Sequence, residues 1–168
     1  MRSVLCTVLL LSLSRAGLAA EPVGFEAPAF LSGPTVSRSA FGVTYAWTGR
    51  SPHAASELQL TVVAVPTGIE GAPSALPAQC IDAFLAELRS RDAALRIDDA
   101  TREIATSQFA MLERRWLSRR GASPVTGVTA CGVHRGYFVS ANYADELKGA
   151  VASFPALRAA LQRLVVRF

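Results

Sequence analysis

The chain has 168 residues, of which 17 are Lys or Arg and 13 are Asp or Glu, for a formal charge of +4. This length suits one domain that can bury a core, and it argues against two domains of ordinary size. A dedicated nucleic-acid binder is not expected, because the N-terminal segment carries Arg2 and Arg15 and no acid, and its removal would leave only +2.

The first twenty residues have the layout of a secretory signal peptide. Arg2 precedes an apolar run over residues 4–13, and small residues at Ala19 and Ala20 follow. The apolar run is too short for a transmembrane helix, so no membrane span is expected. Cleavage after Ala19 or Ala20 fits the small-residue rule. We place it near Ala20, which predicts a periplasmic or secreted protein with one domain over residues 21–168.

The first part of this domain is predicted to be β-rich. Residues 21–39 contain many Pro, Gly and Ser residues, which predicts an irregular lead-in with at most a short strand near Phe30. Residues 43–47 and 58–65 alternate between apolar and polar side chains, which is typical of strands. A loop rich in Gly and Pro follows.

A helix is predicted to begin near Pro77, because Pro suits a first helical turn. Its apolar residues repeat at helical spacing and would form one stripe: Cys80, Ile81, Phe84, Leu85 and Leu88. Such an amphipathic helix packs on a sheet.

The period returns to two between residues 101 and 145. Four strands are predicted, over residues 101–107, 109–117, 125–133 and 137–143. The connections between the last three are short, which indicates an antiparallel meander. The C-terminal segment is then predicted to be helical, with Ser153 as N-cap and Pro155 in the first turn.

Two of the three cysteines lie in the predicted mature domain. Cys6 belongs to the leader and precedes its apolar run, so no lipid anchor is expected. Cys80 and Cys131 form an even pair in a compartment that permits disulfides, and we predict that they are bonded. The alternative is that both are small buried hydrophobic residues. The histidines lack zinc-site spacing to these cysteines, so neither a metal nor a cofactor is expected.

No nucleophile elbow, metalloprotease motif, phosphate loop or dinucleotide fingerprint occurs in the sequence, which favours a protein that is not an enzyme. One acid–base pair remains as an alternative: His134, at the end of a predicted strand, with Asp145 or Glu146 across the hairpin. A locally hydrogen-bonded hairpin histidine is the favoured interpretation of His134, because a catalytic role would need a suitable geometry first. His53 lies in a polar loop and is interpreted as a surface residue.

A cluster of arginines around a tryptophan is the candidate partner-binding surface. It comprises Arg114, Arg115, Trp116, Arg119 and Arg120. Cations beside an aromatic ring bind acidic partners, lipid headgroups or glycans. However, Arg114 and Arg115 point to opposite faces of a strand, so a solvated strand with extended side chains is the alternative.

The order of the elements and three segments resemble the PsbP-like fold. The segments are TVVAVP over residues 61–66, GVTACGVHRGYFVSANYAD over residues 127–145, and FPALRAALQRL over residues 154–164. This fold is shared by the lumenal PsbP subunit of photosystem II and by exported bacterial proteins of the PsbP and DcrB type. The resemblance implies an α+β fold, a twisted antiparallel sheet flanked by helices in an α/β/α sandwich.

The resemblance also implies a binding or assembly module without catalysis. We therefore expect an exported accessory domain that recognises a protein or another envelope component. A small hydrolase and a carrier of an apolar ligand are the alternatives.

Overall fold

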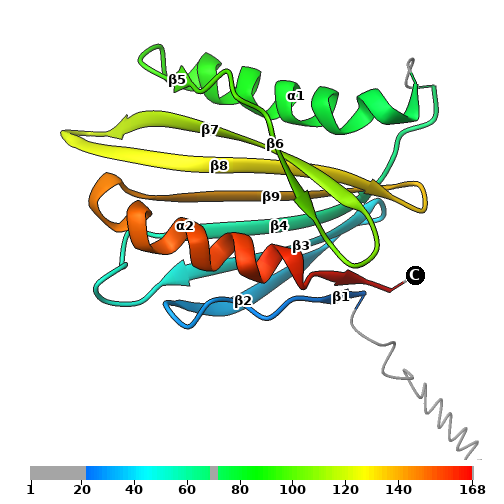
Figure 1. Ribbon diagram of the computed structural model, residues 1–168, viewed down its shortest axis with the longest axis horizontal. Coiled ribbons are helices and arrows are strands. Elements are labelled where there is room, and N and C mark those ends of the chain that lie inside the picture. The colour runs from blue at the N-terminus through cyan, green and yellow to red at the C-terminus, as the bar shows by residue number, and fades with distance from the viewer. Residues whose placement is uncertain (1–21, 69–71, 168) are drawn as a thin grey trace, which may run out of the picture.

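The computed structural model describes residues 22–68 and 72–167. Its centre is an antiparallel sheet of eight strands in the order β2-β3-β4-β9-β8-β7-β5, with β6 paired to β7 (Figure 1). The strands are β2 (Leu31–Arg38), β3 (Gly42–Gly49), β4 (Glu57–Ala64), β5 (Arg96–Ile97), β6 (Arg102–Ala105), β7 (Ala110–Arg120), β8 (Ser123–His134) and β9 (Tyr137–Glu146).

One long helix packs on each face of the sheet. The helices are α1 (Leu76–Arg91), which follows the short 3₁₀ helix η1 (Pro73–Ala75), and α2 (Leu147–Gln162). A small second sheet pairs β1 (Val23–Gly24) with β10 (Val165–Val166). The protein therefore has the expected α+β architecture, with helices on both sides of an antiparallel sheet.

The strands divide their side chains between two cores. On the α2 face, Leu58, Leu60 and Val62 of β4 are buried with Leu157 and Leu161 of α2. On the α1 face, a smaller core contains residues from the helix and from β7 and β8: Ile81, Leu85, Trp116, Val125 and Cys131. β8 is buried along most of its length because it lies under both helices.

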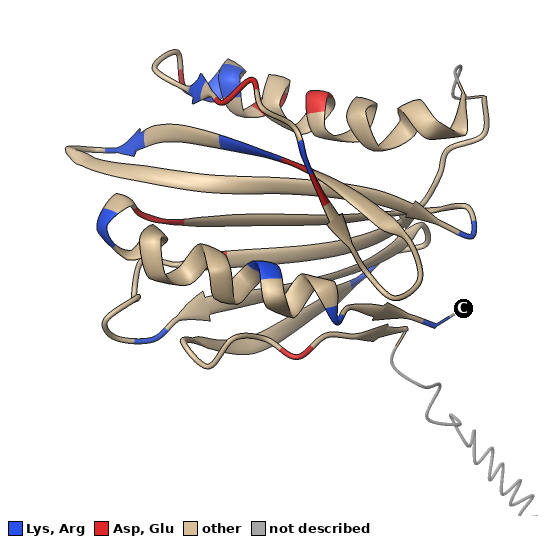
Figure 2. Cartoon of the chain, viewed as in Figure 1, with Lys and Arg blue, Asp and Glu red and all other residues tan. Residues whose placement is uncertain are grey.

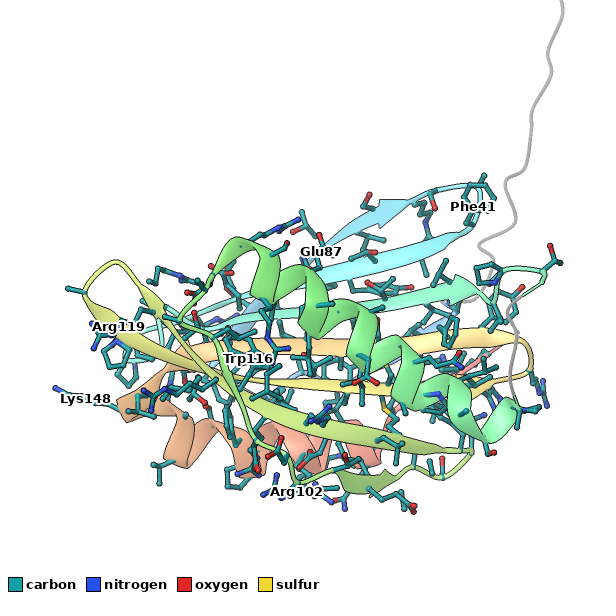
Figure 3. All side chains as sticks on the ribbon, turned by 90° about the horizontal axis from the view of Figure 1, so that it is seen from above. Phe41, Glu87, Arg102, Trp116, Arg119 and Lys148 are labelled. Atoms are coloured by element: carbon teal, nitrogen blue, oxygen red, sulfur yellow. A yellow bond between two sulfur atoms is a disulfide. The ribbon has the colours of Figure 1, made fainter. Side chains whose placement is uncertain are left out.

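The helix α1 covers only part of its face of the sheet. It packs mainly on β8 and β7 and touches β9 at its margin. Seen from the α1 side in Figure 3, the helix crosses the sheet and β2 and β3 lie beyond it. This partial cover leaves space beside the helix, where the site described below is found.

The N-terminal part of the domain is more regular than the sequence predicts. Residues 31–38 form a complete edge strand, with a register shift between Ser32 and Thr35, rather than an irregular lead-in. An edge strand needs ladder hydrogen bonds on one side only, so it tolerates Pro34 and several Ser residues. Composition alone does not show this.

The predicted start of the last helix is wrong. α2 begins at Leu147, so Ser153 is a buried residue inside the helix and not its N-cap. Pro155 stands in the helix interior and is exposed. The carbonyl left without an amide donor belongs to Val151, whose side chain is 83% exposed, so water can solvate this side of the helix. The helix also ends earlier than predicted, since residues 165–166 form β10.

No helix within residues 22–68 and 72–167 has the length and apolar character needed to cross a membrane. The predicted signal peptide and Cys6 lie outside the described residues.

Candidate functional site

The structure does not gather the predicted arginine cluster into one surface. Arg114 projects towards α1, where its Nη1 lies 3.1 Å from Asp82 Oδ1. Arg115 projects to the opposite face, and its guanidinium lies 5.2 Å from the centre of the Phe154 ring on α2. The alternation of side chains along β7 therefore divides the two cations between the faces of the sheet.

Trp116 is part of the core below α1 rather than an exposed platform. Its side chain is buried, and its indole nitrogen donates a hydrogen bond to Thr129 Oγ1 at 3.3 Å. Gly127 faces it on β8, where a Cβ atom would lie only 2.0 Å from the indole ring. Glycine is thus needed at position 127 because the ring occupies the space of a side chain.

The remaining two arginines lie at the turn end of the β7–β8 hairpin. Arg120 Nη1 lies 3.3 Å from Glu57 Oε1, at the start of β4. Arg119 is exposed near the turn between the strands and is labelled in Figure 3.

His134 and Asp145 do not form an acid–base pair. The register of β8 and β9 places His134 opposite Tyr137 and Asp145 opposite Thr126, at the other end of β9. The imidazole of His134 stacks on Phe109, with 5.2 Å between ring centres. The hairpin between β8 and β9 brings only their adjoining ends together, and Asp145 lies eight residues further along β9 than Tyr137, the partner of this histidine.

The histidine beside Asp145 is His53, which the sequence analysis assigns to the surface. His53 Nδ1 lies 3.2 Å from Asp145 Oδ2, and the imidazole is 16% exposed. It borders a cavity of about 410 Å³ at the N-terminal end of α2. Because 92 residues separate the two side chains, no local motif could reveal this pair.

Asp145 is buried inside a network of donors. Its Oδ2 accepts hydrogen bonds from Ser153 at 2.8 Å and Tyr143 at 3.1 Å, and its Oδ1 accepts one from the amide of Glu146 at 2.8 Å. Burial by itself raises the pKa of Asp145, but hydrogen bonds from Ser153, Ser56, His53 and Tyr143 outweigh it and lower the pKa. Burial raises the pKa of Tyr143 to about 12, so the phenol stays protonated and donates.

A disulfide joins Cys80 to Cys131 and fixes α1 on β8. The Cα atoms are 6.2 Å apart, and the bond closes a sequence separation of 51 residues. Cys131 is fully buried on the α1 face of the sheet. The bond therefore holds the helix over one half of the sheet. It is also compatible with an extracytoplasmic location.

A groove of about 530 Å³ lies beside α1, over β3, β4 and β9. Its wall is apolar and consists of Phe84 and Leu88 of α1 with Trp116 of β7. Figure 3 shows Trp116 close beside the helix and Glu87 on the helix itself. A groove of this size suits a small ligand or a short polymer segment.

The floor of the groove is made by side chains of the sheet that point away from α2. Gln59 of β4 is directly opposite Asn142 of β9, with Ala46 and Ala144 nearby. Asn142 Oδ1 is buried and has no hydrogen-bond partner within the described parts of the chain. A buried acceptor without a donor is costly in a folded protein, and a water molecule or a ligand hydroxyl in the groove would supply the donor.

Four charged residues stand at the rim of the groove: Glu57, Glu87, Arg91 and Arg120. They form two ion pairs, Arg91 with Glu87 and Arg120 with Glu57. Arg120 is thus the one rim residue that also belongs to the arginine cluster predicted from the sequence.

β3 and β4 are predictable as strands, but the role of their second face is not evident from the sequence. Period-two alternation places Thr44, Gln59 and Thr61 on the side opposite the core, where they are easily interpreted as ordinary solvated residues. The missing information is the position of α1, which turns this face into one side of a groove.

Within residues 22–68 and 72–167, no group of three or more His, Cys, Asp and Glu side chains is placed to hold a metal ion.

Comparison with solved structures identifies the fold class. The chain is similar to cyanobacterial PsbP (CyanoP) from Synechocystis sp. PCC 6803, with a TM-score of 0.58 and 8% identity over 86% of each chain. It is also similar to PA94 from Pseudomonas aeruginosa, a protein of unknown function described as a putative regulator. There the TM-score is 0.55 and the identity 11%, over 82% of this chain and 99% of the other. The protein thus has a PsbP-like fold, and at these identities the similarity shows the fold alone.

No family model matches the chain. No curated protein matches it either.

Proposed function

We propose that this protein is an exported, non-catalytic binding domain whose ligand site is the groove between α1 and the sheet. The observation that carries the proposal is the groove's combination of an apolar wall with a polar floor that contains an unpartnered amide oxygen. Binding sites of this kind use the apolar surface for affinity and a few polar groups for orientation. The apparent leader and the disulfide support a location outside the cytoplasm.

This proposal moves the expected contact surface from the arginine cluster to the groove. Arg114 and Arg115 already contact Asp82 and Phe154, and they lie on opposite faces of the sheet. The polar floor also disfavours an apolar-ligand carrier, because Gln59 and Asn142 would lose hydrogen bonds to water against a purely apolar molecule.

A groove-filling substitution tests the proposal. Ala46→Trp adds a large ring to the floor of the groove, on a strand position where aromatic residues are well tolerated. Val151→Trp is the matched control, because Val151 is 83% exposed on α2, on the other side of the sheet. Immobilised wild-type protein and both variants are exposed to the same solubilised cell-envelope extract of the source organism.

We expect a component that wild-type protein and Val151→Trp retain equally, and that Ala46→Trp retains at least tenfold less. Equal retention by all three proteins would show that the groove is not the binding site. Circular dichroism and thermal unfolding confirm that the variants fold.

The His53–Asp145 pair favours a second candidate function, hydrolysis with His53 as the general base. An acid that holds one imidazole nitrogen leaves the other free to accept a proton from water. Hydrolysis of p-nitrophenyl acetate by His53→Gln and by the control His134→Gln tests it. Activity lost only in His53→Gln supports this candidate, and equal rates in both variants and wild type exclude it for this ester.

A further inference from the structure

The floor of the groove is uncharged. β3 carries no charged residue, β4 carries one only at its first position, and those of β9 are confined to its last two. Figure 2 shows the same distribution, with blue and red segments on α1, around β6 and β7, and at strand ends and turns. A charged ligand would lose its hydration over this floor without gaining an opposite charge.

Small polar side chains line the same face in cross-strand rows. Thr44, Thr61 and Ser140 are successive partners across β3, β4 and β9, and the hydroxyls of Thr44 and Thr61 are 3.1 Å apart. The next row contains Gln59 and Asn142, which lie in the groove itself. Hydroxyl and amide groups both donate and accept hydrogen bonds, so the rows suit a ligand that does the same.

The rim adds no net charge. Its two glutamates and two arginines are paired with each other, Glu87 with Arg91 and Glu57 with Arg120. Since these pairs are exposed, each can still offer carboxylate acceptors and guanidinium donors to a neighbouring hydroxyl. The complementary ligand is therefore polar and uncharged.

The position of the groove argues against recognition of an extended peptide. Peptides that bind to sheets usually pair their backbone with a free strand edge. Here β3, β4 and β9 each have a strand on both sides, so their backbone groups are used within the sheet. Only side chains are offered to the ligand.

From these observations we propose that the groove binds a neutral oligosaccharide. Sugar hydroxyls would pair with Gln59 and donate to the buried Asn142 Oδ1, while the C–H surfaces of the ring would pack on Phe84, Leu88 and Trp116. This inference rests on the proposed function, since it names the ligand class of the same groove.

A glycan array that carries neutral, anionic and cationic oligosaccharides tests this proposal with the folded mature protein. Two variants are compared with wild type. Gln59→Leu removes the floor amide, and the control Gln162→Leu makes the same change at an exposed position of α2. Both sites are exposed, so both variants are expected to fold.

We expect wild type and Gln162→Leu to bind a set of neutral glycans, with affinities at least tenfold lower in Gln59→Leu. Preference for anionic or cationic glycans would overturn the proposal, as would equal binding by Gln59→Leu.

Failure of this inference can be told apart from failure of the proposed function. If no glycan binds while Ala46→Trp still abolishes retention of a protease-sensitive envelope component, the ligand class is wrong and the groove remains the site. If neither binding depends on the groove, both proposals are wrong.

Discussion

At the scale of single residues, the buried carboxylate of Asp145 makes the fold sensitive to substitution of the residues that contact it. It joins the 50–56 loop, through His53 and Ser56, to Ser153 in the middle of α2. All of these contacts lie on the α2 side of the sheet, away from the groove. Substitutions here are therefore expected to change stability and not ligand binding.

Asp145→Asn should lower the free energy of unfolding by about 3 kcal/mol at neutral pH, because an amide cannot accept all the hydrogen bonds that the carboxylate accepts. The pKa of Asp145 is lowered from its ordinary value of 3.8 in the folded protein. The ionised group thus stabilises the fold above that pH, and this contribution is lost as the pH falls through the folded-state pKa.

Urea unfolding at several pH values between 7 and 2.5 measures this effect. The difference in stability between wild type and Asp145→Asn should shrink as the solution becomes acidic. A difference that stays constant over this range would show that the charge of Asp145 does not contribute.

The carboxylate of Asp145 also leaves no room for a side chain at Gly149. A Cβ atom at this position would lie 2.6 Å from Asp145 Oδ2. Gly149→Ala should therefore destabilise the protein by about 1–2 kcal/mol, even though alanine favours helices over glycine by about 1 kcal/mol. Val151→Ala, at an exposed position of the same helix, should stay within about 0.5 kcal/mol of wild type in thermal unfolding. A stabilised Gly149→Ala variant would contradict the close approach.

At the scale of elements, the observed α2 differs from the predicted helix in the position of Pro155. The proline lies in the interior of the observed helix and in the first turn of the predicted one. Pro155→Ala should restore an amide donor inside α2 and stabilise the protein by about 1–2 kcal/mol in urea unfolding. If the helix instead began at Ser153, proline would occupy the first turn and its removal would bring no gain. No change, or a loss of stability, would therefore contradict the observed start of α2.

The disulfide between α1 and β8 is expected to contribute about 4 kcal/mol in the chain-entropy model for a loop of this size. Replacing both Cys80 and Cys131 by Ala should lower the stability of the fold by about this amount, and reducing agent should then have no further effect. Hydrogen exchange should accelerate in α1 and not in α2, because only α1 is held by the bond. Equal changes in both helices would contradict this local role.

Several elements are predictable because their pattern is local. The alternation of Leu58 and Leu60 with polar residues gives β4, and the stripe containing Ile81 and Leu85 gives α1. β2 and the start of α2 are missed, since tertiary packing outweighs the Pro and Ser signals at these places. The Cys80–Cys131 pairing follows from the cysteine count and from the face of each predicted element.

At the scale of the whole molecule, the arrangement of layers creates the candidate site. α2 seals the larger core on one face, while α1 is held over β7 and β8 and leaves β3, β4 and part of β9 open. The groove is the boundary between covered and uncovered sheet. Gln59, Asn142 and Trp116 meet there from three different strands, so no sequence pattern could bring them together beforehand.

The central claim, that ligand binding takes place in this groove, is tested most directly by NMR spectroscopy. Isotope-labelled mature protein is titrated with the neutral oligosaccharide that gives the strongest array signal, and shifted resonances are mapped on the fold. We expect the largest changes at the side-chain amides of Gln59 and Asn142 and at the indole of Trp116. Changes confined to the arginines of the β7–β8 hairpin or to the His53 cavity, or no changes at all, would contradict the account.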